Sequence, residues 1–124
     1  LRTMGKYYIV DIGLRNYLLG FRDVDTGHIL ENVIYFELLR HGYDVAIGKV
    51  GNKEVDFIAT NAEEKRYIQV TESMNEPATR ERELAPLRMI PDNYEKLVIA
   101  ANCDNPVTHD GIKIVRLTDF LLES

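Results

Sequence analysis

Four side chains on three successive segments of this chain could together hold a hard metal ion. Glu31 lies near the start of a helical pattern, Asp56 lies in mid-strand, and Gln69 and Thr71 lie two apart on the next strand. Oxygen atoms of this kind are the ligands that Mg²⁺ takes in proteins, and a bound Mg²⁺ can activate water at a phosphodiester. The order of helix acid, strand acid and polar pair therefore indicates metal-assisted phosphodiester chemistry. Asp56 and Gln69 are its candidate metal ligands.

Each of these residues also has an ordinary structural role. A glutamate near a helix start, such as Glu31, suits the positive end of the helix dipole. Asp56 could face solvent or pair with Lys53 or Lys65. The polar pair on the following strand is unremarkable by itself, so only the combination and its order indicate a site.

A long amphipathic helix should carry Glu31. Apolar residues at one-face spacing predict a helix over 27–41, which ends at Gly42 because glycine is favoured just past a helix C-terminus. Glu31 lies one position off this apolar stripe and could lean over the metal-binding patch. The predicted apolar face comprises Leu30, Val33, Ile34 and Leu38.

Five strands and three further helices complete the pattern. Strands are predicted over 44–49, 54–60, 65–72, 96–101 and 111–116, with tight turns over 48–53 and 61–64. Helices are predicted over 11–19, over 75–89 with Asn75 as a cap and Pro86 as a late disturbance, and over 119–122 capped by Thr118. The order of elements predicts an α/β fold with a mixed central sheet flanked by helices.

Alternation assigns the strand side chains to faces. Strand 54–60 should place Val55, Phe57 and Ala59 on one face and Asp56 on the other. In strand 65–72, Gln69 should share a face with Tyr67 and Thr71. The two strands are close enough in sequence to pair as a hairpin, which would bring Gln69 toward Asp56.

Composition limits the function classes. The 124 residues carry 15 basic and 20 acidic side chains, a net charge of −5, and unaided nucleic-acid binding usually needs a basic excess. No apolar run approaches the ~20 residues that span a bilayer, and no signal peptide is evident. The single cysteine, Cys103, has no partner for an internal disulfide. We expect a cytoplasmic protein without a membrane segment.

The chain begins with Leu1 and not with methionine, which favours a piece cut from a longer protein. The expected organisation is a single domain over residues 1–124. Residues 1–26 would form a helical lead-in and residues 27–124 the core.

Three segments, 6–16, 27–32 and 54–57, resemble a C-terminal domain of unknown function in prokaryotic AAA-type ATPases. The resemblance extends over nearly the whole chain. It implies that an N-terminal ATPase module with a phosphate loop is the partner of this domain. It also implies a fold similar to the PD-(D/E)xK restriction-endonuclease-like fold.

Within that resemblance, Glu31 matches the helix acid and Asp56 the strand acid, whereas many relatives carry an acid and a lysine where this chain has Gln69 and Thr71. An amide oxygen is a poorer Mg²⁺ ligand than a carboxylate, and loss of the lysine cation costs ~10²-fold in rate. Lys65 lies six residues from Thr71, roughly 20 Å along an extended strand, so it is poorly placed as a substitute.

Three functions follow as hypotheses. The first is a nuclease-like but inert partner or regulatory domain of an AAA-type ATPase. The second is a Mg²⁺-dependent nuclease in which the carbonyl of Val70 joins Glu31, Asp56 and Gln69. The third is a nucleic-acid or protein adaptor. The adaptor would use Arg80, Arg82 and Arg88.

Overall fold

The computed structural model describes residues 26–122, with side chains from residue 29 onward. The predicted helix over 11–19 and nearly all of the predicted lead-in lie outside this range. The described elements are α2 (Thr26–Arg40), β1 (Asp44–Val50), β2 (Lys53–Thr60), β3 (Lys65–Ser73), α3 (Pro77–Arg88), β4 (Glu95–Asn102), β5 (Lys113–Arg116) and α4 (Leu117–Leu122). None of these helices is long and apolar enough to cross a membrane.

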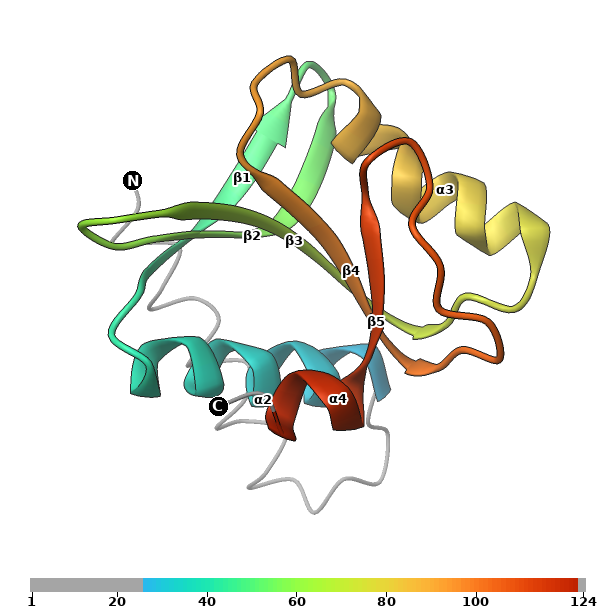
Figure 1. Cartoon of the computed structure of the whole chain (residues 1–124), viewed down its shortest axis with the longest axis horizontal. Helices are drawn as coiled ribbons and strands as arrows, with labels where there is room; N and C mark the ends of the chain where they lie inside the picture. The colour runs from blue at the N-terminus through green and yellow to red at the C-terminus, as the bar shows by residue number, and fades with distance from the viewer. Residues whose placement is uncertain (1–25, 123–124) are drawn as a thin grey trace.

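A five-stranded mixed sheet in the order β1-β2-β3-β4-β5 forms the centre of the fold. The first three strands form an antiparallel meander, and β4 and β5 then add parallel to β3 and to each other. α3 connects β3 to β4 and lies on one face of the sheet, whereas α2 and α4 lie on the other (Figure 1). The predicted α/β fold with a mixed sheet and flanking helices is confirmed.

Two hydrophobic cores fill the two faces of the sheet. The α2-side core joins α2 and α4 to the sheet and consists of Leu30, Ile34, Tyr35, Leu38, Val45, Phe57, Ala59, Ile68, Val70, Leu97, Ile99 and Phe120. The α3-side core joins α3 to the opposite face and consists of Val55, Tyr67, Met74, Leu84, Leu87, Ile90, Val98, Ala100, Cys103, Ile112 and Ile114. Because both faces are covered, the central strands are buried on both sides.

The helix predicted over 27–41 is α2, and Gly42 ends it as expected. Gly42 has a φ of +87°, and its N–H and that of Tyr43 donate to the open carbonyls of the last turn. The predicted apolar face is wrong at Val33, which is 39% exposed, because Tyr35 is buried in its place. The buried stripe is therefore rotated toward the side of the helix that carries Glu31.

A β-bulge in β2 corrects the predicted faces of that strand. Ala46 pairs with Ile58 and Gly48 with Val55, so Asp56 and Phe57 together oppose one residue of β1. The extra residue breaks the alternation. Val55 joins the α3-side core, while Phe57 and Ala59 join the α2-side core, although the sequence placed all three on one face.

Two helix starts differ from prediction. α3 has Glu76 at its N-cap without a side-chain bond, and Asn75 instead accepts a hydrogen bond from the Asp104 N–H at 2.9 Å. Helix α4 begins at Leu117, so Thr118 lies inside its first turn and is not its cap.

The last strand is shorter than predicted. It begins at Lys113 because Asp110 and Gly111 form a tight turn, with φ values of +51° and +80°. His109 and Ile112 close this turn through two backbone hydrogen bonds of 2.9 and 2.7 Å.

Gly48 is required by close packing between the strands. A Cβ at this position would lie 2.7 Å from Cδ1 of Ile58 and 3.2 Å from Cβ of Val55. We expect Gly48→Ala to lower the free energy of unfolding by about 1–3 kcal/mol through overpacking, as measured by urea denaturation. Ile58→Ala removes both Cδ1 and Cγ1 of Ile58, which would lie 2.7 and 2.8 Å from the new Cβ, so the double variant should lose less than the sum of the single losses. Additive losses would contradict a steric cause.

Candidate functional site

Asp56 and Gln69 meet where the regular pairing of β2 with β3 stops. The register of paired residues ends at Phe57 and Ile68, next to the bulge. Beyond it, the N–H of Asp56 donates to Oε1 of Gln69 at 2.9 Å, and the N–H of Val70 donates to Oδ2 of Asp56 at 2.8 Å. Side-chain oxygens thus accept the backbone N–H groups where the regular pairing of β2 with β3 has ended. The predicted approach of Gln69 to Asp56 is confirmed.

The amide of Gln69 is occupied at both ends. Its Oε1 accepts from Asp56, and its Nε2 donates to the backbone carbonyl of Glu83 on α3 at 3.2 Å. Gln69 is only 5% exposed, and it is buried in spite of being polar. Buried polar groups need such partners, so this side chain serves as a cross-link between the sheet and α3.

Glu83 is a site residue that the sequence reasoning missed. It lies in a run of alternating charge that predicts a solvated helix face, yet its side chain is 16% exposed, against 71% for Arg82 and 66% for Glu81. The missed signal is its spacing from Leu84 and Leu87, which are fully buried in the α3-side core. Glu83 directly precedes Leu84 and lies four residues before Leu87, which places it beside the buried face of the helix.

The carboxyl groups of Asp56 and Glu83 are both largely buried, and their charges interact. Burial raises the pKa of Asp56 from its usual 3.8 to about 6, against the favourable hydrogen bond from Val70 and with a further rise from Glu54. Burial also raises the pKa of Glu83 to about 7, and the charge of Asp56 adds to this rise. Clustered groups with raised pKa values are typical of functional sites and of buried sites that hold charge at a cost.

Thr71 and Glu31 occupy different positions relative to this cluster. Thr71 is half-buried on β3, and its hydroxyl donates to the carbonyl of Ser73 at 3.4 Å. Glu31 is half-buried on α2, one turn before Tyr35, whose ring stacks on Phe57 with centroids 6.2 Å apart. Glu31 therefore lies on the side of α2 toward β2. Its role as the helix acid of a metal site stays a prediction.

Asp56 and Gln69 offer few ligands to a metal ion. Within residues 26–122, no three histidine, cysteine, aspartate or glutamate side chains gather closely enough to hold a metal ion. The predicted ligand Gln69 already accepts the Asp56 N–H through its oxygen. Asp56 and Gln69 as arranged therefore fit a divalent cation poorly.

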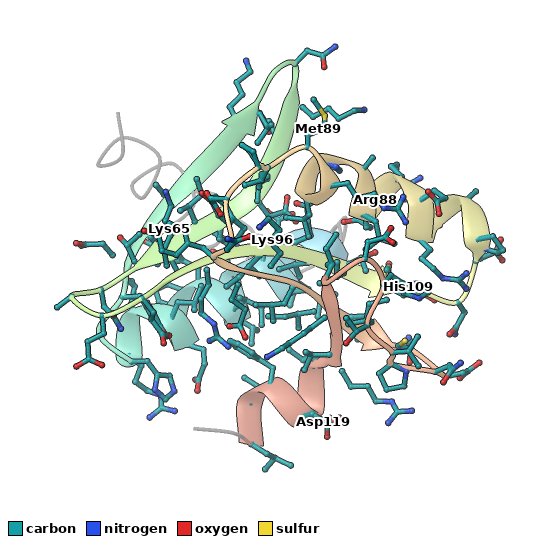
Figure 2. The ribbon with its side chains drawn as sticks, turned by 45° about the horizontal axis from the view of Figure 1, so that its top comes forward. Lys65, Arg88, Met89, Lys96, His109 and Asp119 are labelled. Carbon is teal, nitrogen blue, oxygen red and sulfur yellow. The ribbon has the colours of Figure 1, made fainter. Side chains whose placement is uncertain are left out.

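The arginines of α3 are largely committed to contacts within the domain. Arg80 donates to the carbonyls of Met74 and Asn75 at 3.4 and 3.3 Å. Arg88 pairs with Glu81 at 2.6 Å and with Asp110 at 2.9 Å, across to the loop before β5 (Figure 2). Arg82, whose side chain is 71% exposed, lies 4.0 Å from the Glu83 carboxylate, so each of the three arginines has a partner within the domain. These contacts weaken the case for phosphate binding on this helix.

Lys65 takes part in an aromatic cluster. Its ammonium lies 5.2 Å from the ring centre of Tyr67 and 5.5 Å from that of Tyr94, and Lys96 on the neighbouring strand lies 5.7 Å from Tyr67 (Figure 2). These cation–π contacts place Lys65 near the start of β3. They favour a structural role over that of a substitute lysine at the Asp56 cluster.

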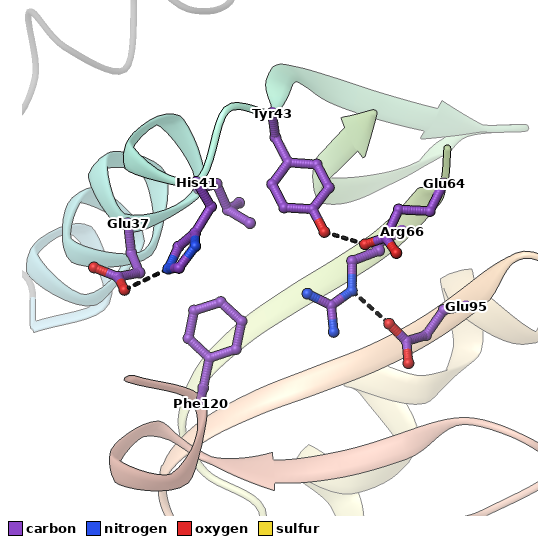
Figure 3. A pocket seen from close by; sticks show the side chains of 8 residues that line it. Glu37, His41, Tyr43, Glu64, Arg66, Glu95 and Phe120 are labelled. Atoms are coloured by element: carbon purple, nitrogen blue, oxygen red, sulfur yellow. Dashed lines mark hydrogen bonds and ion pairs between the residues drawn. The ribbon is translucent and has the colours of Figure 1, made fainter. Parts of the chain in front are cut away.

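A second polar space lies on the α2 side of the sheet. It is a half-open cavity of about 420 Å³ lined by Glu37, Leu38, His41, Tyr43, Glu64, Arg66, Glu95 and Phe120. Its charged groups pair with one another: His41 lies 3.0 Å from Glu37, Tyr43 donates to Glu64, and Arg66 donates to Glu95 (Figure 3). The first contact lies at the end of α2, the second joins the segment after α2 to the turn before β3, and the third joins β3 to β4.

Comparisons with known proteins identify relatives but no function. The chain is 40% identical over 123 residues to an uncharacterized protein of Haemophilus influenzae, a match that covers 99% of this chain and 30% of the relative. It is 34% identical over 121 residues to an uncharacterized protein of Methanocaldococcus jannaschii, covering 94% of this chain and 24% of the relative. No protein-family model and no solved structure matches the chain. The chain thus spans 24% to 30% of the length of these relatives.

Proposed function

We propose that this domain is a nuclease-like but catalytically inert module, and that it serves as the partner or regulatory domain of a cytoplasmic AAA-type ATPase. The observation that carries the proposal is the amide of Gln69, which is hydrogen-bonded to Asp56 at one end and to the Glu83 carbonyl at the other. A metal-dependent nuclease would place a metal-binding carboxylate at this position. Here the same position carries an amide whose oxygen and nitrogen are both hydrogen-bonded within the domain.

The arrangement of elements supports a restriction-endonuclease-like fold. A helix precedes an antiparallel meander of three strands, and a crossover helix then leads to a parallel fourth strand. Asp56 of the second strand meets Gln69 of the third beside a bulge, and bulges often re-aim side chains beside active sites. A shared fold does not transmit an activity, so inactivity is argued from Gln69 and Thr71 alone.

The association with an ATPase rests on the resemblance of segments 6–16, 27–32 and 54–57. The relatives extend well beyond the matched region, which is compatible with a further module in each. In the Haemophilus influenzae relative, the purified whole protein should hydrolyse ATP, and deletion of the matched region should change that rate. A whole protein without ATPase activity would contradict the partnership.

A second candidate is a metal-dependent nuclease with an unusual ligand set. It is favoured by Glu83, whose carboxyl is close enough to Asp56 for their charges to interact and which the sequence did not predict. Two poorly solvated carboxylates repel each other, and a divalent cation would relieve that repulsion. In this second candidate function, Glu83 supplies the metal-binding carboxylate that Gln69 lacks.

A Mg²⁺ titration separates the two candidates. We expect that amide spectra of the ¹⁵N-labelled chain show no saturable shift at residues 56, 69 or 83 up to about 10 mM Mg²⁺, because the Gln69 oxygen already accepts the Asp56 N–H and an amide oxygen is a weak Mg²⁺ ligand. Asp56→Ala serves as the control. Saturable shifts that vanish in this variant, together with cleavage of DNA or RNA, would replace the inert domain by the nuclease.

A further inference from the structure

Helix α3 contains a proline near its end. Pro86 lies two residues before the last residue of the helix and is buried with Leu84 and Leu87. A proline inside a helix has no N–H to donate, and its ring pushes away the carbonyl four residues earlier, which is that of Arg82. The helix then closes with tighter bonds, from the Met89 N–H to the Pro86 carbonyl at 3.3 Å and on to Ile90.

The carbonyl that Gln69 binds lies in the same turn. The Glu83 carbonyl follows directly after that of Arg82, and it accepts the Nε2–H of Gln69 at 3.2 Å. A helix carbonyl can take such an extra donor when the turn around it is opened toward the sheet. Pro86 and Gln69 thus act on one stretch of α3 from two sides, one from within the helix and one from β3.

We propose that Pro86 is a positioning residue for Asp56 and acts through Glu83 and Gln69. Pro86 opens the helix turn, and the Glu83 carbonyl fixes which end of the Gln69 amide faces α3. The other end then presents its oxygen to the Asp56 N–H. Without the carbonyl, the amide could rotate and bring its NH₂ group against that N–H. This device holds α3 over Asp56 whether the site is inert or binds a cation.

The test compares the two prolines of α3 in the 124-residue chain. Pro77 lies in the first turn and is exposed, where a proline removes no internal bond, so Pro77→Ala is the matched control. In Pro86→Ala, the side-chain NH₂ resonances of Gln69 should move toward free-amide values and exchange with water about tenfold faster. In Pro77→Ala they should match the unmodified chain.

A second variant approaches the contact from the strand. Gln69→Met keeps the size of the side chain but cannot donate, so amide exchange should quicken at 87–89 while residues 80–82 keep their protection. Unchanged Gln69 resonances in Pro86→Ala would overturn the proposal. Equal effects of the two proline variants, or uniform loosening of α3 in Gln69→Met, would overturn it as well.

Discussion

Gln69→Glu is expected to lower the free energy of unfolding by about 3 kcal/mol or more at pH 8, because it adds a buried charge without a counter-ion. The new carboxylate could still accept the Asp56 N–H, but it would face the Glu83 carbonyl with an acceptor where Nε2 donates at 3.2 Å. It would also lie beside two carboxyl groups whose pKa values are already raised. Three acids would then compete for one poorly solvated space.

The loss should shrink at pH 5, since a protonated glutamate can donate to the Glu83 carbonyl and carries no charge. Urea denaturation at both pH values measures the difference, and Gln69→Met is the control that removes the amide bonds without adding charge. The Met variant should lose about 1–3 kcal/mol with little dependence on pH. Equal losses for Gln69→Glu at pH 5 and pH 8 would show that charge is not the cause.

The same variant also bears on the two candidate functions. If millimolar Mg²⁺ restores the stability of Gln69→Glu at pH 8, the scaffold can still hold a cation once the amide is replaced. Combined with Thr71→Lys, such a site would carry both groups that the resemblance places there. Restoration would support the view that inactivity results from these two positions and not from the rest of the fold.

The sequence could predict the elements around the site because each has a local cause. Apolar residues spaced along one helical face predicted α2, turn residues predicted the hairpins, and the glycine at position 42 predicted the end of the helix. The bulge in β2 could not be predicted in this way. Both faces of the sheet are covered, so Val55 and Phe57 are equally apolar although they face opposite cores. When residues on both faces are apolar, the alternation along a strand does not reveal the extra residue of a bulge.

The contact between Asp56 and Gln69 was predicted, and the approach of Glu83 from α3 was missed. Asp56 and Gln69 were found because their spacing on adjacent strands brings them together whatever covers the sheet. Glu83 depends on how α3 packs, and its neighbours in sequence are exposed charges. Gln69 was interpreted as a weak ligand, and its structural role became evident only from its bond to the Glu83 carbonyl. That bond joins elements whose packing no local pattern specifies.

Asp56→Asn is expected to stabilise the domain by about 1–3 kcal/mol at pH 8. The folded-state pKa of Asp56 is raised from 3.8 to about 6, a difference that corresponds to at most about 3 kcal/mol. A raised carboxyl pKa means that the folded state holds its proton more tightly than the unfolded state. The contribution of Asp56 to stability is therefore full below pH 4 and is lost as the pH rises through 6. Asparagine is neutral throughout and can still accept the Val70 N–H through its Oδ1.

The gain should accordingly vanish near pH 4 and be complete above pH 7, as measured by thermal or urea denaturation across this range. Glu72 is exposed on the neighbouring strand β3, so Glu72→Gln is a control that should change stability by less than about 0.5 kcal/mol. A loss of stability in Asp56→Asn at pH 8 would mean that the carboxylate is held by a favourable partner and not by burial at a cost. A gain would mean that the fold retains a destabilising acid at position 56, in the bulge of β2 and near Glu83 of α3. Packing alone does not explain why such an acid is retained.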